Sequence, residues 1–279
     1  MPMALAAACS PPGVPAGEAT AASLIWCELM ARAVAVVGGT GGLGEAVVRR
    51  LARSRPVVIG YRKQRSKAES LAKEVSEYGH SAWPVPVNIT DPASVESFFR
   101  LSSDYAGALE HVVSVTGPSI PLCPLLEVGS DDFRRIIDTD VYGTFNILKQ
   151  AVPLLENAGG GSIVVFVTTA VLRTLENDGM SSVPKTAVAG LVRLAAREAG
   201  VRNVRCNAVA PGVIDAGIVH SSFVVNEVAK KVISDCLDRT PMPRMGRPEE
   251  VAALVEYLCS DEAAYINGQV IAVDGGYSA

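Results

Sequence analysis

The stretch VVGGTGGLG at residues 36–44 decides the fold of this 279-residue chain. It joins a β-branched run, AVAVVG (33–38), to LGEAVVRRLARS (43–54), which has helical spacing. Glycines let the backbone turn tightly and approach a pyrophosphate, while the helix that follows points its first amides at the phosphates. Three spacings of the dinucleotide-binding motif fit these glycines at once, and a purely structural turn is the alternative. The motif therefore indicates a dinucleotide site without naming a subfamily.

Strand-like and helix-like segments alternate from residue 33 to the C-terminus. This alternation predicts an α/β, Rossmann-type doubly wound parallel sheet of about seven strands, with helices on both faces and a single domain over 31–279. Prolines within the strand expected at 81–88 indicate an irregular edge or a strand end. The other strands are expected at 33–38, 56–61, 111–117, 161–169, 204–212 and 268–276, and long helices at 66–79, 130–157, 181–199 and 248–259.

The amino-acid composition and net charge argue against several classes of protein. The net charge of −4 argues against a dedicated nucleic-acid binder, and no apolar run reaches the roughly 18 residues that a membrane span needs. Six cysteines without a CxxC pair and three scattered histidines predict free thiols in a reducing, cytoplasmic location and no metal site. Residues 1–30 are rich in alanine and proline, and we interpret them as a disordered tail or a start-site extension.

The end of the second expected strand indicates which dinucleotide binds. The sequence GYRKQRSK (60–67) carries Arg62 and Lys63 and no acidic residue. Enzymes that use NAD commonly place an acid here for the ribose 2′-hydroxyl, whereas a cation accommodates the 2′-phosphate of NADP. The sequence therefore predicts NADP(H) rather than NAD(H). The alternative is an ordinary solvated basic loop.

Motifs along the rest of the chain resemble the standard-length branch of the short-chain dehydrogenase/reductase family. The likeness runs from residue 33 to 279 and is most specific in its C-terminal stretch. The matching segments are VNITD (87–91), SVTG (114–117), DTDVYGTFN (138–146), GSIVVFVTTA (161–170), SSVPKTAVAGLVRLAARE (181–198), RCNAVAPGVI (205–214) and PMPRMGRPEEVAALVEYLCSDEAAYINGQVIAVDGG (241–276).

The resemblance implies where the cofactor binds. The residues come from the glycine turn, from the ends of the expected strands and from the helix that carries Lys185. They are Gly38, Thr40, Gly41, Gly42, Leu43, Gly44, Tyr61, Arg62, Lys63, Asn88, Ile89, Ser114, Thr116, Gly117, Lys185, Pro211, Gly212 and Val213.

The resemblance also implies an atypical catalytic set. Lys185 is kept, but Ser181 stands at the position of the catalytic tyrosine, Thr169 at that of the serine and Asp140 at that of the asparagine. A serine hydroxyl is a far weaker acid than a phenol, whose pKa is about 10. Asp140 and Lys185 could together hold a water as acid and base, an arrangement similar to that of peroxisomal-type 2,4-dienoyl-CoA reductases.

Two alternatives to this pair remain open. It could be a structural ion pair in a site without chemistry. A tyrosine from elsewhere could also replace the missing phenol, the candidates being Tyr142, Tyr105 and Tyr265.

We therefore expect an NADP(H)-dependent oxidoreductase with a non-standard proton donor. Hydride would pass to or from a carbonyl, an alcohol or a conjugated C=C of a small hydrophobic or acyl-thioester substrate, with specificity set by residues 117–129 and 213–240. The alternative is a catalytically inactive subunit or nucleotide-binding scaffold that partners an active homologue. The resemblance implies a homodimer or homotetramer, or a hetero-oligomer with such a homologue.

Overall fold

Seven parallel strands form one sheet in the described part of the computed structural model, which covers residues 32–118, 120, 122–217 and 227–279. The interpretation of residues 1–30 falls outside these ranges. The spatial order is β3-β2-β1-β4-β5-β6-β7, and every neighbouring pair is parallel. The strands are β1 (Ala33–Val37), β2 (Val57–Tyr61), β3 (Ala82–Pro86), β4 (Leu109–Ser114), β5 (Gly161–Phe166), β6 (Val204–Pro211) and β7 (Val270–Val273).

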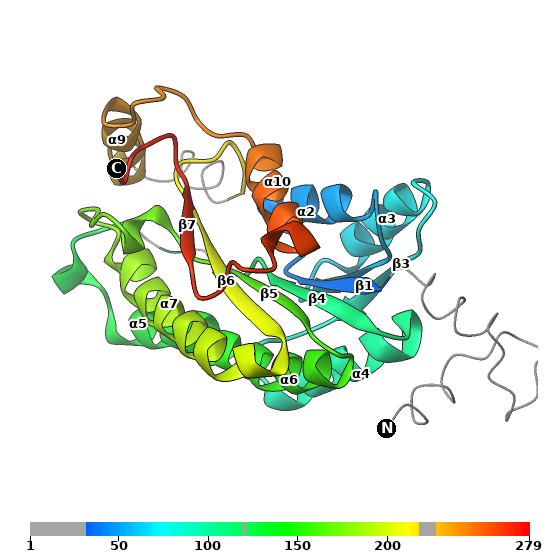
Figure 1. Ribbon diagram of the computed structural model, residues 1–279. Coiled ribbons are helices and arrows are strands. Elements are labelled where there is room, and N and C mark those ends of the chain that lie inside the picture. Colours follow the sequence, from blue (N-terminus) through cyan, green and yellow to red (C-terminus); the bar gives the residue numbers. More distant parts are fainter. Residues whose placement is uncertain (1–31, 119, 121, 218–226) are drawn as a thin grey trace, which may run out of the picture. The chain divides into compact units, whose positions relative to one another are not determined.

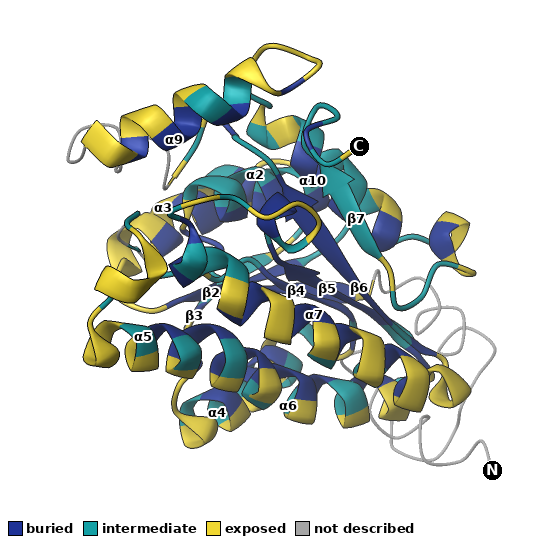
Figure 2. Ribbon diagram, turned by 90° about the vertical axis from the view of Figure 1, so that its left-hand side faces the viewer, coloured by how far each residue is buried: buried dark blue, intermediate teal, exposed yellow. Residues whose placement is uncertain are grey.

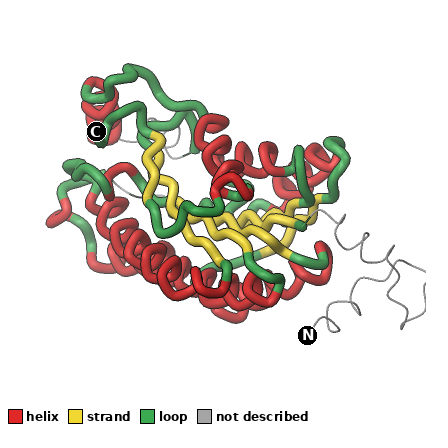
Figure 3. The backbone as a smooth tube through the Cα atoms, in the orientation of Figure 1, coloured by secondary structure: helices red, strands yellow, loops and turns green. Residues whose placement is uncertain are grey.

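Helices cover both faces of this sheet, which confirms the predicted doubly wound fold (Figures 1 and 3). One layer holds α4 (Pro92–Ala106), α5 (Ser130–Ile137), α6 (Gly143–Asn157) and α7 (Gly179–Ala199), and the other holds α2 (Gly42–Leu51), α3 (Arg65–Ser76) and α10 (Pro248–Leu258). A further helix, α9 (Glu227–Asp238), lies beyond the carboxyl ends of the strands. No described helix is both long and apolar enough to cross a bilayer.

Two apolar cores, one on each face, hold the layers together. Alternate residues of β1 serve the two cores: Val34 and Val36 pack with α2, α3 and α10, whereas Ala35 and Val37 pack with α4, α6 and α7. The strands between the two edges of the sheet are therefore largely buried on both sides, as Figure 2 shows, whereas the edge strand β7 is only partly buried and exposed residues lie along the outer faces of the helices. This explains why the strand sequences are continuous apolar runs instead of alternating ones.

The strand order reverses direction between β1 and β4. From β1 the chain first winds outward to β2 and β3, and it then returns to place β4 on the other side of β1. Such a switch point opens a crevice beyond the carboxyl ends of the strands, and ligands of doubly wound sheets bind there. The site is therefore expected where the loops after β1, β4, β5 and β6 meet.

Two local details bear on the sequence predictions. The proline-containing strand β3 lies at the edge of the sheet, as its prolines predict, because a proline offers no amide for a further ladder. The long helical segment predicted over 130–157 is confirmed, but it is not α-helical throughout. A π-helical turn at Asp138–Tyr142 separates α5 from α6, and such turns often mark functional sites.

Candidate active site

A cavity of about 440 Å³ opens at the carboxyl ends of β1, β4, β5 and β6. It is bounded by the glycine turn on one side and by α7 and α9 on the other, and its wall is mostly apolar. The lining residues discussed below are Gly41, Gly42, Leu43, Gly44, Thr116, Gly117, Thr168, Thr169, Asp178, Ser181, Lys185, Pro211, Gly212, Val213, Cys236 and Tyr277. This volume is in the usual range of a small-molecule site.

The glycine turn forms a backbone cradle at the start of α2. Gly38 has φ +84°, a conformation that residues with a side chain rarely adopt. A side-chain carbon at Gly42 would lie 2.6 Å from the amide nitrogen of Gly217, so this glycine admits the loop that follows β6. No side chain caps α2, whose first residue lines the cavity. The turn therefore fits a pyrophosphate bound by main-chain amides.

Lys185 and Asp140 meet below the cavity. Lys185 lies on α7 and Asp140 on the π-helical turn, and Nζ of the lysine is 3.2 Å from Oδ1 of the aspartate. The same Nζ donates to the carbonyl oxygen of Thr116 at 2.9 Å, which links the pair to the end of β4. Both side chains are buried, so water screens their attraction little.

The carboxyl of Asp140 is buried beside this cation. Its Oδ1 is buried and makes no well-aligned hydrogen bond to any described residue, even though the lysine nitrogen is close. Burial raises the pKa of this carboxyl, and the charge of Lys185 only partly opposes the shift. Lys185 lines the cavity, and a buried cation there suits a ligand hydroxyl, so the site fits the ribose of a nicotinamide nucleotide.

Thr169, which the sequence placed at the serine position, has its hydroxyl engaged elsewhere. It donates to Oδ2 of Asp274 at 2.6 Å and is buried. Thr168 is half-buried in the same cavity wall, and its hydroxyl accepts from the amide of Ala170 at 3.3 Å. The hydroxyl proton of Thr168 has no acceptor among the described residues. Thr168 is therefore better placed than Thr169 to donate to a substrate oxygen.

Ser181 lines the cavity on the first turns of α7, and two residues that sequence reasoning missed lie close to it. Asp178 is 6% exposed and stands immediately before α7. Tyr277, near the C-terminus, is buried in the cavity wall beneath the guanidinium of Arg173, which lies 5.1 Å from the ring centroid. A polar residue in an N-terminal helix position, three residues before Ser181, was the available signal for Asp178.

The tyrosines considered as replacements for the phenol do not line this cavity. Tyr142, Tyr105 and Tyr265 are 59%, 52% and 103% exposed, respectively. A phenol on the protein surface cannot reach a substrate held above Ser181. Among the described residues, Tyr277 is the tyrosine that contributes to the cavity wall.

The basic residues after β2 lie outside the main cavity but at the same end of the sheet. Arg62 and Lys63 are exposed and form no ion pair with a described residue, while Tyr61 before them is buried. The amides of Gly38 and Gly39 both donate to the carbonyl oxygen of Gly60, so the glycine turn and this strand end are held together. The two free cations therefore stand beside the phosphate cradle.

The remaining predicted cofactor residues form the walls on either side of β1. Asn146 of α6 donates to the carbonyl oxygen of Ile89 at 2.9 Å and fixes the loop after β3, in which Asn88 is half-buried. Ser114 and Thr116 share a hydrogen bond of 3.2 Å at the end of β4. Thr40 in the glycine turn is buried, and Gly212 donates its amide to Val273 at the end of β7.

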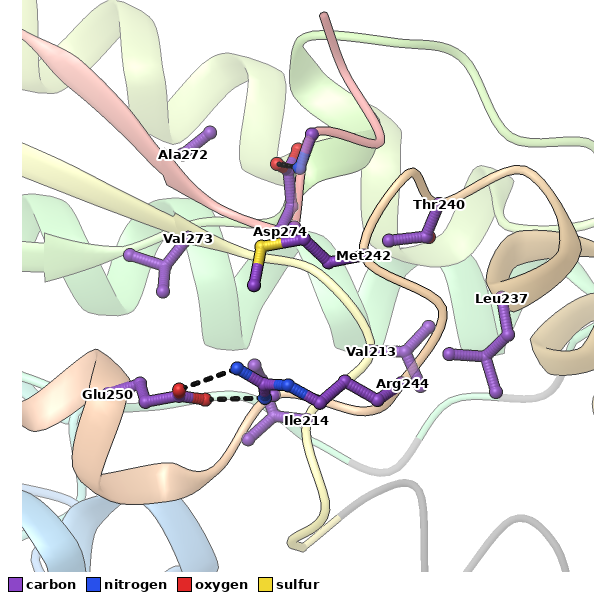
Figure 4. A pocket seen from close by; sticks show the side chains of 13 residues that line it. Val213, Ile214, Leu237, Thr240, Met242, Arg244, Glu250, Ala272, Val273 and Asp274 are labelled. Atoms are coloured by element: carbon purple, nitrogen blue, oxygen red, sulfur yellow. Dashed lines mark hydrogen bonds and ion pairs between the residues drawn. The ribbon is translucent and has the colours of Figure 1, made fainter.

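Residues from both predicted specificity segments line the cavity. Among them are Ile120 and Leu122 from the first segment and Val232 and Ile233 from the second, whereas 218–226 lie outside the described residues. A second cavity of about 370 Å³ adjoins the site behind Val213. Figure 4 shows it, closed at one side by the two hydrogen bonds between Arg244 and Glu250. Within the described ranges, no cluster of His, Cys, Asp and Glu could hold a metal ion.

Comparisons with known proteins agree with this geometry. Residues 38–278 match the family model described as enoyl-(acyl carrier protein) reductase. The chain is 35% identical over 254 residues to cis-4-hydroxycyclohexanecarboxylate dehydrogenase of Sinomonas cyclohexanicum, covering 90% of this chain and 99% of that protein.

Solved structures give the same result. A short-chain type dehydrogenase/reductase from Mycobacterium ulcerans matches with a TM-score of 0.82 and 33% identity, over 88% of this chain and 90% of that one. A 7α-hydroxysteroid dehydrogenase, solved with NADH and 7-oxoglycochenodeoxycholic acid, matches with a TM-score of 0.80 and 25% identity, over 88% and 93%.

Proposed function

The chain belongs to the short-chain dehydrogenase/reductase family of oxidoreductases, and on this premise we propose that it is an NADP(H)-dependent carbonyl or enoyl reductase with a non-standard proton donor. The observation that carries the proposal is the buried contact between Lys185 and Asp140 at the base of a cavity that begins at a glycine cradle. When bound, the nicotinamide nucleotide supplies or accepts the hydride.

The preference for NADP(H) is supported by Arg62 and Lys63. They are exposed cations beside the phosphate cradle, and the described residues offer them no carboxylate partner. A 2′-phosphate placed between them gains charge-assisted hydrogen bonds, whereas a 2′-hydroxyl gains none of comparable strength.

Lys185 and Asp140 have separate tasks in this proposal. Lys185 donates to the ribose hydroxyls, since its Nζ already points along the end of β4 toward Thr116. Asp140 keeps that ammonium charged and, together with it, holds a water that exchanges protons with the site. Thr168 orients the substrate oxygen with its hydroxyl, the task that the sequence assigned to Thr169.

The apolar wall supports a hydrophobic substrate with a carbonyl or a conjugated alkene. Ile120, Leu122, Leu175, Val232 and Ile233 surround the space above Ser181. The relative from Sinomonas is named for a cyclic alcohol, and the solved 7α-hydroxysteroid dehydrogenase holds a steroid ketone. We therefore propose cyclic ketones and alcohols as the first substrates to test, followed by enoyl thioesters.

The test is NADPH oxidation by the full chain, followed by the absorbance of the reduced nicotinamide. The panel contains 4-oxocyclohexanecarboxylate, a 7-oxo bile acid, a 2-enoyl thioester and a 2,4-dienoyl thioester. We expect turnover with at least one of them and a loss on the order of 10²-fold in Lys185→Ala. Binding of NADPH without turnover of any substrate would instead support an inactive subunit that partners an active homologue.

We also propose that the chain assembles as a homodimer or homotetramer. Apolar side chains are exposed on α6 and α7, namely Phe145, Val183 and Leu194. Helices that present such residues to solvent are typical of subunit contacts. Sedimentation equilibrium of the full chain is expected to give a mass of two or four chains, and Leu194→Lys is expected to lower it.

A further inference from the structure

We propose that Asp178 is the acid/base residue of this site and that it exchanges a proton with the substrate oxygen through the hydroxyl of Ser181. This inference rests on the proposed function, because it assigns the non-standard proton donor of that reaction. It differs from the role given above to Asp140 and Lys185, which hold the ribose and a water.

The geometry of the helix start frees the Asp178 carboxyl for this task. An aspartate immediately before a helix usually caps it by accepting from an amide of the first turn. Here the side chain makes no such bond, and the amides of Ser181 and Ser182 instead donate to the main-chain oxygen of Asp178, at 3.0 and 2.9 Å. Asp178 and Ser181 both line the cavity, and the Ser181 side chain acts to lower the pKa of the Asp178 carboxyl.

The backbone before Asp178 holds it in this position. Asn177 has φ +64°, which is uncommon for a residue with a side chain. Its carbonyl oxygen accepts from the amide of Cys123 at 3.0 Å, so the segment is tied to the loop after β4. Unusual backbone conformations of this kind cluster at active sites, where the surrounding structure maintains them.

The Asp178 carboxyl is suited to proton exchange near neutral pH. Burial raises its pKa to about 7, although the contact with Ser181 works in the opposite direction. An acid with this pKa is close to the optimum for general catalysis at neutral pH. The N-terminus of α7 stabilises the carboxylate that remains once the proton has left.

The titratable groups that face Asp178 are mostly neutral in this pH range. Cys236 comes from α9 and Tyr277 from the C-terminal segment, and burial raises the pKa of both. Cys236 and Tyr277 also interact with each other, and each affects the pKa of the other. The charged groups around these side chains are Arg173, which covers the Tyr277 ring, Asp235 and Arg239 beside Cys236, and Lys185, which is paired with Asp140.

The reduction then balances as follows. The carbonyl carbon of the substrate accepts the hydride with its electron pair from the reduced nicotinamide, and the C=O π pair moves to oxygen. That oxygen takes the Ser181 hydroxyl proton, while Ser181 takes the proton of Asp178. The Asp178 carboxylate is reprotonated from water. In sum, ketone, NADPH and one proton give alcohol and NADP⁺, and alcohol oxidation follows the reverse path.

The test compares pH profiles of kcat for ketone reduction in the wild type, Asp178→Asn and Asp140→Asn, with Asp131→Asn as an exposed control on α5. Deuterated NADPH verifies, through a primary isotope effect, that hydride transfer limits the rate. We expect wild-type kcat to fall about tenfold per pH unit above pH 7, because the acid loses its proton. Asp178→Asn is expected to lower kcat by about 10²- to 10³-fold and to abolish this decline of kcat above pH 7, which we call the pH limb.

Binding separates a catalytic from a structural role. NADPH affinity, measured by fluorescence, is expected to change by no more than about twofold in Asp178→Asn. Ser181→Ala is a second variant that leaves Asp178 in place, and it is expected to lower kcat while the pH limb remains. It keeps the test decisive if Asp178→Asn does not fold.

Each outcome is informative. An unchanged kcat and pH limb in Asp178→Asn overturns the inference, and so does a limb that disappears only in Asp140→Asn. If Asp178→Asn does not fold, an unchanged kcat in Ser181→Ala overturns it. In all three cases the proposed reductase activity stands. No ketone reduction by a wild type that binds NADPH overturns the proposed carbonyl reduction itself, and the inference with it.

Discussion

Asp140 and Lys185 form a buried pair of opposite charges. Removing one member of such a pair is more damaging than removing both, because the remaining charge has neither water nor a partner. The pair therefore belongs to the candidate active site and also holds α7 against the π-helical turn.

We predict that Lys185→Met lowers the free energy of unfolding by about 3–5 kcal/mol at pH 8, because the Asp140 carboxyl stays buried without its cation. Asp140→Asn in the same chain is expected to restore most of this loss. Urea unfolding of the two single variants and the double variant gives the coupling energy. A loss below about 1 kcal/mol in Lys185→Met would show that water reaches the pair.

Asp178 predicts a pH dependence of stability. Its pKa is about 7 in the folded chain against the ordinary value of 3.8, so the native state holds the proton more tightly than the unfolded state. The resulting stabilisation is complete below about pH 4 and is lost as pH rises to about 7, by up to about 4 kcal/mol.

Asp178→Asn removes this ionisable group, so we expect the variant to be more stable than the wild type at pH 8. The difference is expected to shrink toward pH 4. Thermal unfolding at both pH values, with Asp131→Asn as the exposed control, measures it. Equal stability of Asp178→Asn and wild type at pH 8 would contradict a buried, costly carboxylate.

At element scale, the strand ends and helix starts present the chemistry. The π-helical turn at Asp138–Tyr142 rotates the side-chain positions of α6 relative to those of α5. This rotation lets Asp140 face Lys185 on α7. The segment after β7 is equally important, because it closes the cavity with Tyr277. Asp274 holds that segment by accepting from the Thr169 hydroxyl at 2.6 Å and from the amides of Gly276 and Ser278.

We predict that Asp274→Ala lowers the free energy of unfolding by about 1–3 kcal/mol, because these donors lose a shared acceptor. Partial burial opposes ionisation, but the hydrogen bonds from Thr169 and Ser278 prevail and lower the pKa of Asp274. The contribution of the Asp274 carboxylate to the free energy of unfolding is therefore present at neutral pH. It is lost on acidification below the ordinary aspartate pKa of 3.8. Adding Thr169→Val to Asp274→Ala should have little further effect, and additive losses in the double variant would contradict the shared bond.

At the scale of the whole molecule, the winding of the sheet brings the loops after β1, β4, β5 and β6 to one cavity. The residues that line this cavity come from segments between Gly41 and Tyr277, so a ligand that fills it would connect distant parts of the chain. Binding to the folded state alone stabilises it in proportion to the logarithm of ligand concentration over Kd. Cofactor preference can therefore be read from thermal stability.

We predict that NADPH at 100 times its Kd raises Tm by about 5–10 °C, since it adds about 2.7 kcal/mol to the free energy of unfolding. NADH at the same concentration is expected to give a smaller rise, because Arg62 and Lys63 have no 2′-phosphate to bind. The variant Arg62→Ala/Lys63→Ala should remove the difference between the two nucleotides. A larger rise with NADH would overturn the proposed preference for NADP(H).

The sequence by itself determined the doubly wound sheet, the position of the glycine turn and the edge strand β3. These features depend on local properties: β-branched runs, helical periodicity, glycine conformations and the missing amide of proline. Residues separated by a fixed number of helical positions, such as Ser181 and Lys185, were also placed correctly on one helix.

Only the tertiary structure decided which side chains face the cavity. Thr168 and Thr169 are adjacent in sequence, and the distant Asp274 determines which hydroxyl is engaged. Tyr277 and Cys236 reach the cavity because β7 and α9 fold back over it. The carboxyl of Asp178 is buried by segments far from it along the chain, and its ionisation follows from that burial. Local sequence cannot encode such contacts, because each depends on how separate elements pack.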